Sequence, residues 1–178
     1  MKKFSTRLVL WHELHGRKNL PWQRKITPYK VWVSEIMLQQ TQVVTATPYF
    51  KKFIQEFPTV KSLSKATPDQ VLKLWSGLGY YARARNLHKA AKLICSNHEG
   101  KIPSSINELV ELPGIGKSTA GAILSLGFKK KAPILDGNVK RVLARHFKIE
   151  GNLQASSTTK HLWQISESLL PSDRIDIY

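Results

Sequence analysis

The segment Leu112-Pro113-Gly114-Ile115-Gly116 constrains the fold most strongly, because it forms a very short connection between two helical segments. Proline ends the first helix, and glycine accepts backbone conformations that other residues disfavour. The next helix starts near Lys117, and its first N–H groups are free to bind an anion such as a phosphate. The sequence therefore predicts a helix-hairpin-helix, with a plain corner between two helices as the alternative.

The charge of the chain favours a polyanionic partner. In 178 residues, 28 Lys and Arg stand against 12 Asp and Glu, which gives a formal charge of +16. Such a balance is typical of proteins that bind DNA, RNA or an acidic membrane surface. No apolar stretch approaches the roughly 20 residues of a membrane span, and the N-terminal residues do not resemble a secretion signal. Cys95 is the only cysteine, so the chain cannot form an internal disulfide.

Helix signals repeat along the chain, whereas strand signals are nearly absent. Three Thr-Pro pairs predict helices that begin at Pro28, Pro48 and Pro68, each with threonine as N-cap. Apolar periodicity predicts further helices near residues 5–15, 80–97, 104–111, 117–127, 137–147 and 158–169. We therefore expect an all-α protein.

Longer motifs resemble a known family. Residues 112–120, followed by Asp136, resemble the helix-hairpin-helix and Gly/Pro-Asp signature of the endonuclease III superfamily of base-excision DNA glycosylases. The segments that resemble the MutY family of adenine DNA glycosylases within it are 20–22, 27–32, 34–35, 37–42, 77–86 and 134–143. The resemblance covers roughly residues 7–150.

The resemblance implies a helix-hairpin-helix DNA glycosylase fold in two lobes. Residues 22–132 would form a six-helix barrel lobe that includes the hairpin at 111–121. Residues 1–21 and 133–178 would form a second helical lobe, incomplete at its C-terminal end. The resemblance weakens after residue 150.

Two carboxyl groups suit the chemistry of this family. Release of adenine requires a proton on the leaving purine and negative charge near the sugar cation. Glu35 lies on a largely apolar helix face, which should raise its pKa and keep it a proton donor. Asp136 precedes a helix whose N–H groups should hold it ionised. From the residues alone, a solvated glutamate and an ordinary N-cap remain open; the resemblance implies catalytic roles for both, and an orienting role for Asn138.

Ser118 bears on the type of reaction. In the strand-cleaving members of the superfamily the matching position is a lysine that forms a Schiff base. Serine cannot form an imine, so the resemblance implies a monofunctional enzyme. Lys117 is a poor substitute, because on a helix it points about 100° away.

Other residues are expected to hold DNA. Gly114, Gly116, Lys117 and Ser118 belong to the expected phosphate grip of the hairpin. Gln39 and Tyr80 match family residues that wedge into the base stack and probe the opposite strand. Arg83, near a helix start, fits a phosphate contact or simple surface exposure. Leu20 and Trp22 match residues that line the adenine pocket, although their composition alone suggests ordinary core.

The chain departs from the family in its cysteines. MutY proteins carry four cysteines that ligate a 4Fe-4S cluster, and then a Nudix-like domain that recognises 8-oxoguanine. None of those cysteines is present, so we expect a fragment or a shortened homologue.

The expected substrate is double-stranded DNA with adenine opposite 8-oxoguanine or guanine. We expect the protein to bind it as a monomer. The expected location is the bacterial cytoplasm, in association with the nucleoid and without membrane attachment. A thymine mismatch glycosylase of the same superfamily and a non-catalytic DNA-binding module remain alternatives.

Overall fold

The computed structural model describes residues 2–171 and 174, and the regular structure of these residues is helical. The elements are α1 (Lys2–His15), η1 (Pro21–Gln23), α2 (Pro28–Leu38), α3 (Val43–Glu56), α4 (Val60–Lys65), α5 (Pro68–Trp75), α6 (Ala82–Asn97), α7 (Ile106–Val110), α8 (Lys117–Ala122), η2 (Ile123–Gly127), α9 (Gly137–His146) and α10 (Ser156–Ser168). The short η1 is a 3-10 turn, and η2 continues α8 as a π-helical turn. The predicted all-α class is confirmed.

Two of the three Thr-Pro pairs begin helices as predicted. The Thr27 hydroxyl accepts a hydrogen bond from the Lys30 N–H at 3.2 Å, and Pro28 follows it as the first residue of α2. Thr67 caps α5 in the same way, with Pro68 as its first residue. Proline suits this position because the N–H it lacks would have no partner within the helix.

The prediction for Thr47-Pro48 is wrong. Helix α3 begins at Val43, so Pro48 lies inside it, and the Thr47 hydroxyl donates to the Val43 carbonyl at 2.8 Å instead of capping. Proline inside a helix removes one backbone hydrogen bond. Here the buried side chains of Ala46, Phe50 and Phe53 stabilise the helix on both sides of the proline. The short α4, capped by Thr59, was not predicted at all.

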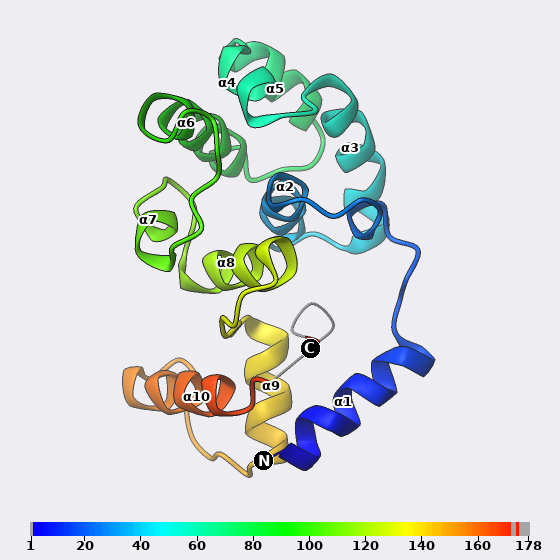
Figure 1. Cartoon of the computed structure of the whole chain (residues 1–178), viewed down its shortest axis with the longest axis vertical. Coiled ribbons are helices and arrows are strands. Elements are labelled where there is room, and N and C mark those ends of the chain that lie inside the picture. The colour runs from blue at the N-terminus through cyan, green and yellow to red at the C-terminus, as the bar shows by residue number, and fades with distance from the viewer. Residues whose placement is uncertain (1, 172–173, 175–178) are drawn as a thin grey trace.

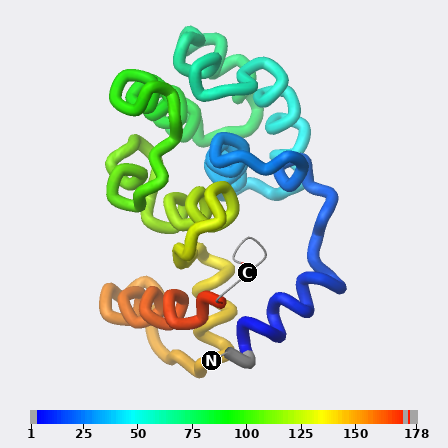
Figure 2. The backbone as a smooth tube through the Cα atoms, in the orientation of Figure 1, coloured from blue at the N-terminus to red at the C-terminus, as the bar shows by residue number. Residues whose placement is uncertain are grey.

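The described residues form two hydrophobic clusters. The larger one packs around Trp32, Phe53 and Trp75, and α2 runs through its middle between α3, α6 and α8 (Figure 1). The smaller one joins α9 and α10 through Leu143 and Leu162, with α1 beside them. Figure 2 shows the chain leaving α1, rising along one edge to α2, and returning after α8 to the smaller cluster. A boundary near residue 132 remains our prediction for the two lobes.

The segment 133–135 connects the two clusters and is held from both sides. On one side it crosses α8 so closely that a Cβ atom on Gly121 would overlap the Pro133 carbonyl oxygen. On the same side the Ser118 hydroxyl accepts a hydrogen bond from the Leu135 N–H at 3.2 Å. From α10, the Ser166 hydroxyl donates to the Ile134 carbonyl at 3.0 Å. These contacts fix the residue that follows, Asp136.

In the part of the chain that the structure describes, no helix combines the length and the apolar character that a membrane span requires.

Gly121→Ala should lower the free energy of unfolding by about 1–3 kcal/mol, because the added methyl group must displace the backbone of Pro133. Gly137→Ala is the matched control, since no atom lies within 4 Å of a Cβ at that position. Chemical denaturation of both variants measures the difference. Equal stability of Gly121→Ala and the wild-type chain would contradict the close packing of α8 on this segment.

Candidate active site

An open cleft of about 800 Å³ lies where the end of α2, the turn after it, α8 and the start of α9 meet. It brings together five residues that the sequence singled out, although the first and last of them lie more than a hundred positions apart. These are Glu35, Gln39, Ser118, Asp136 and Asn138.

Glu35 has an unusual protonation equilibrium for a carboxylic acid. Burial raises its pKa from 4.5 to about 7, and the negative charge of Asp136 adds to the rise. The sequence predicted the direction from the apolar helix face. Both carboxyl groups line the cleft, so the charge of Asp136 is close enough to disfavour ionisation of Glu35. At neutral pH a substantial fraction of Glu35 therefore carries a proton that it can donate.

Asp136 is the N-cap of α9, and its carboxylate is oriented by three hydrogen bonds. One oxygen accepts from the N–H groups of Asn138 at 2.9 Å and Val139 at 2.8 Å. The other oxygen accepts from the side-chain amide of Asn138 at 3.4 Å. The helix N-terminus suits a carboxylate at this position. Asn138 thus contacts Asp136 as an orienting residue would.

Arg141 also lines the cleft and was missed by the sequence analysis. Its guanidinium donates to the side-chain oxygen of Asn138, one turn earlier on α9. The resulting chain of hydrogen bonds runs from Arg141 through Asn138 to Asp136. The spacing of three residues on one helix was the available signal, because such residues lie on the same face.

The hairpin forms as predicted between α7 and α8. Leu112 and Ile115 are buried, and Gly114 adopts a φ of +80°, which favours glycine. Gly116 has an ordinary φ and is exposed as the N-cap of α8. No atom lies within 4 Å of a Cβ at Gly116, so the space in front of this backbone is open.

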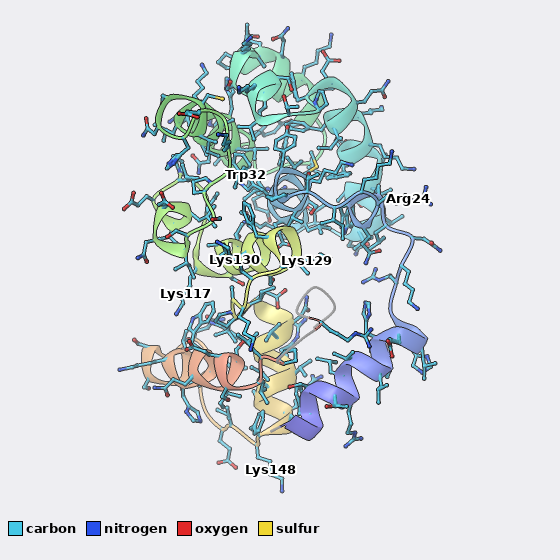
Figure 3. The ribbon with its side chains drawn as sticks, in the orientation of Figure 1. Arg24, Trp32, Lys117, Lys129, Lys130 and Lys148 are labelled. Atoms are coloured by element: carbon cyan, nitrogen blue, oxygen red, sulfur yellow. The ribbon has the colours of Figure 1, made fainter. Side chains whose placement is uncertain are left out.

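Ser118 and Lys117 point in different directions, as their helix positions require. Ser118 lines the cleft, whereas Lys117 does not. The Lys117 ammonium lies over the ring of Trp163 on α10, 4.3 Å from its centroid, and Figure 3 shows Lys117 between the two clusters. Lys117 therefore contacts the smaller hydrophobic cluster in this structure. Its contact with a DNA phosphate stays a prediction.

The side chain of Arg83 does not extend into solvent as a phosphate ligand would. Its guanidinium donates to backbone oxygens at the end of α2, including that of Met37 at 3.0 Å. The last carbonyl groups of a helix lack partners within the helix and attract a cation. The Arg83 guanidinium therefore contacts the protein backbone here, and its contact with a DNA phosphate stays a prediction.

Leu20, Trp22 and Tyr80 lie outside the cleft. Trp22 packs edge-on against Phe50, with ring centroids 5.4 Å apart, as an ordinary core residue does. Leu20 precedes η1 and is partly buried. The role of Leu20 and Trp22 in an adenine pocket stays a prediction. Tyr80 is 60% exposed in the loop before α6.

The residues present do not fit an iron-sulfur cluster. Cys95 is the only cysteine of the chain, and it packs against the larger hydrophobic cluster. Among residues 2–171 and 174, no group of three or more His, Cys, Asp or Glu side chains could hold a metal ion. A 4Fe-4S cluster requires four ligands, typically thiolates, which this chain does not contain.

The chain is similar in sequence to proteins named adenine DNA glycosylase. The adenine DNA glycosylase of Buchnera aphidicola (subspecies Acyrthosiphon pisum) is 54% identical over 168 residues, which are 94% of this chain and 48% of that protein. The adenine DNA glycosylase of Rattus norvegicus is 38% identical over 180 residues, covering 96% of this chain and 35% of its own length. The chain thus spans about half the length of the bacterial relative and about a third of the mammalian one.

Solved structures share the fold. A thermostable thymine-DNA glycosylase superposes with a TM-score of 0.89 at 26% identity, over 99% of this chain and 81% of that one. A non-covalent endonuclease III–DNA complex gives a TM-score of 0.75 at 18% identity, over 98% and 78%. The family model of the HhH-GPD superfamily base excision DNA repair proteins matches residues 33–168. The chain therefore belongs to the HhH-GPD superfamily of base excision DNA repair proteins.

Proposed function

We propose that the chain is a monofunctional adenine DNA glycosylase that hydrolyses the N-glycosidic bond of adenine opposite 8-oxoguanine or guanine in double-stranded DNA. The observation that carries the proposal is the interaction of Glu35, with its pKa near 7, and the oriented Asp136 in one cleft. The adenine glycosylases among its relatives support the choice of base. In this proposal the protein is a monomer, and it acts on DNA in the bacterial cytoplasm.

The two carboxyl groups have complementary roles in this reaction. Glu35 donates its proton to a ring nitrogen of adenine, so that the base leaves as a neutral molecule when the bond to the sugar breaks. The Asp136 carboxylate stabilises the positive charge that develops on the sugar. A water molecule then adds to the sugar carbon and returns a proton to Glu35. Asn138 holds Asp136 in place during these steps.

Adenine must leave the duplex before the carboxyl groups can reach it. In our proposal the N–H groups of the hairpin at Gly114 and Gly116 grip a phosphate, which positions the DNA without reading its sequence. Gln39 bonds to base edges, and Tyr80 stacks in the gap that the adenine leaves.

Thymine removal from a T·G mismatch is the second candidate, because the structure superposes well on a thymine-DNA glycosylase. A single-turnover assay on duplexes with A opposite 8-oxoguanine, A opposite G, and T opposite G separates the two. Alkaline treatment of the products distinguishes base release from strand cleavage. Release of thymine alone would overturn the adenine assignment, and release of no base would leave a DNA-binding module.

Glu35→Gln should lower the single-turnover rate by at least about 10²-fold, because the amide cannot donate a proton to the base. For the wild-type chain the rate should be constant below the Glu35 pKa of about 7 and fall as the pH rises through it, since the protonated form is the donor. Rates measured from pH 5 to 9 test both points. A rate that increases with pH would exclude Glu35 as the acid.

Asp136→Asn should bind DNA like the wild-type chain but release adenine at least about 10²-fold more slowly, because the amide does not stabilise a cation. The side-chain oxygen of asparagine still caps α9, so the fold is retained. Gel-shift binding and single-turnover rates on the same duplex measure the two properties. A wild-type rate would contradict the role of Asp136, and loss of binding would indicate a structural defect instead.

Ser118→Lys should introduce strand cleavage, because Ser118 lines the cleft beside Asp136. An amine at this position can attack the sugar carbon and form an imine, which borohydride reduces to a stable covalent adduct. The wild-type chain is the control, since Lys117 lies on Trp163 and should form no adduct. Absence of an adduct with Ser118→Lys, in a variant that still binds DNA, would show that position 118 does not face the sugar.

A further inference from the structure

We infer that Arg83 is a positioning residue that joins the turn carrying Gln39 to the loop carrying Tyr80, so that both side chains enter the duplex as one rigid unit. The inference rests on the proposed function, in which Gln39 and Tyr80 replace the extruded adenine. It concerns extrusion of the base and not cleavage of the bond, because Arg83 does not line the cleft.

Arg83 acts as a clamp between the end of α2 and the loop before α6. Its first set of contacts is with the end of α2. One terminal nitrogen of Arg83 donates to the carbonyl oxygens of Ile36 and Met37, both at 3.0 Å. The carbonyl oxygen of Gln39, the predicted wedge residue itself, is a third acceptor of the same nitrogen, which shares its two N–H groups among these oxygens. The Thr41 hydroxyl completes this side at 3.3 Å. The guanidinium thus holds the turn after α2 through its backbone.

The second side is the loop before α6. The other terminal nitrogen of Arg83 donates to the carbonyl oxygens of Gly79 at 3.2 Å and Leu78 at 3.4 Å. The guanidinium also lies over the ring of Tyr80, 5.3 Å from its centroid, and 5.5 Å from that of Trp75. The guanidinium therefore contacts both the backbone of the loop before α6 and the ring of Tyr80.

The chemistry of arginine explains why one side chain can join the two loops. Its planar guanidinium offers five donors in a fixed geometry and stacks on aromatic rings. A lysine ammonium is a compact group with three donors on a flexible stem, so it cannot reach both sets of carbonyl groups in the same way. Arg83→Lys therefore keeps the charge but breaks the bridge.

Both loops contain strained backbone, at Tyr80 itself and at the residue directly after Gln39. Gln40, directly after Gln39, has a φ of +56°, and Tyr80 has a φ of +51°. Residues other than glycine disfavour this left-handed region, and they persist there only where neighbouring contacts hold them. Arg83 supplies such contacts to both loops. Without it, each loop is free to relax separately, and the two wedge side chains lose their common placement.

The test separates extrusion from cleavage. 2-Aminopurine, an adenine analogue that fluoresces when unstacked, replaces the target adenine in a duplex opposite guanine, and stopped-flow fluorescence reports extrusion. Adenine release is measured on a paired duplex and on one in which the adenine faces an abasic site and is already unpaired. Arg83→Lys should slow extrusion and release from the paired duplex by about tenfold or more, because the wedge residues are misplaced. Release from the unpaired duplex should change less than about twofold.

Arg85→Lys, the same change at an exposed arginine two residues further along α6, is the matched control and should leave the rates unchanged. If Arg83→Lys fails to fold, Thr41→Val removes one hydroxyl from the clamp and should slow extrusion by about threefold.

Three results would overturn the inference. The first is that Arg83→Lys slows adenine release equally on the paired and the unpaired duplex. The others are an extrusion rate of Arg83→Lys equal to that of the wild-type chain, and no change in 2-aminopurine fluorescence with the wild-type chain. If the wild-type chain releases no adenine at all, the proposed function fails, and the fluorescence comparison alone decides the role of Arg83.

Discussion

The site depends on the tight packing of the segment 133–135 between α8 and α10. This segment carries the chain from the larger hydrophobic cluster to the smaller one, and Asp136 follows it directly. Gly121 permits the close approach, while Ser118 and Ser166 bond to the backbone of the segment from opposite sides. A displacement of the backbone here would move Asp136 relative to Glu35, which belongs to α2 in the larger cluster. The distance between the two carboxyl groups is thus set by packing outside the cleft.

The electrostatics follow from this geometry. Glu35 lies on a helix of the larger cluster, where burial disfavours its charged form. Asp136 lies at an exposed helix N-terminus, where N–H groups hold the carboxylate. Its charge then raises the pKa of Glu35 further. In the proposed mechanism, two identical functional groups take different roles because their surroundings differ, which is a common arrangement in enzymes that cleave glycosidic bonds.

The sequence predicted those features that depend on local chemistry. The hairpin, the caps at Thr27 and Thr67, and the raised pKa of Glu35 all follow from neighbours along the chain. The start of α3 was predicted wrongly because buried side chains outweigh the preference of Pro48 for a helix start. The particular partners of Arg83 and Trp22 were not predicted, although ordinary core packing was an alternative for Trp22.

These side chains are held by partners from distant parts of the sequence, and a single sequence contains no signal for such contacts. Arg83 bonds to carbonyl groups more than forty positions earlier, and Trp22 packs on Phe50. The importance of Gly121 is of the same kind, since only the fold brings Pro133 against it.

Titration of Glu35 by carbon-13 NMR of its carboxyl group tests the central claim, that the fold presents a protonatable Glu35 to Asp136. The wild-type chain should titrate with a pKa of about 7, and Asp136→Asn should lower this pKa, because the second carboxylate no longer opposes ionisation. A wild-type pKa near the ordinary value of 4.5, or one that Asp136→Asn leaves unchanged, would contradict the arrangement of the two carboxyl groups described above.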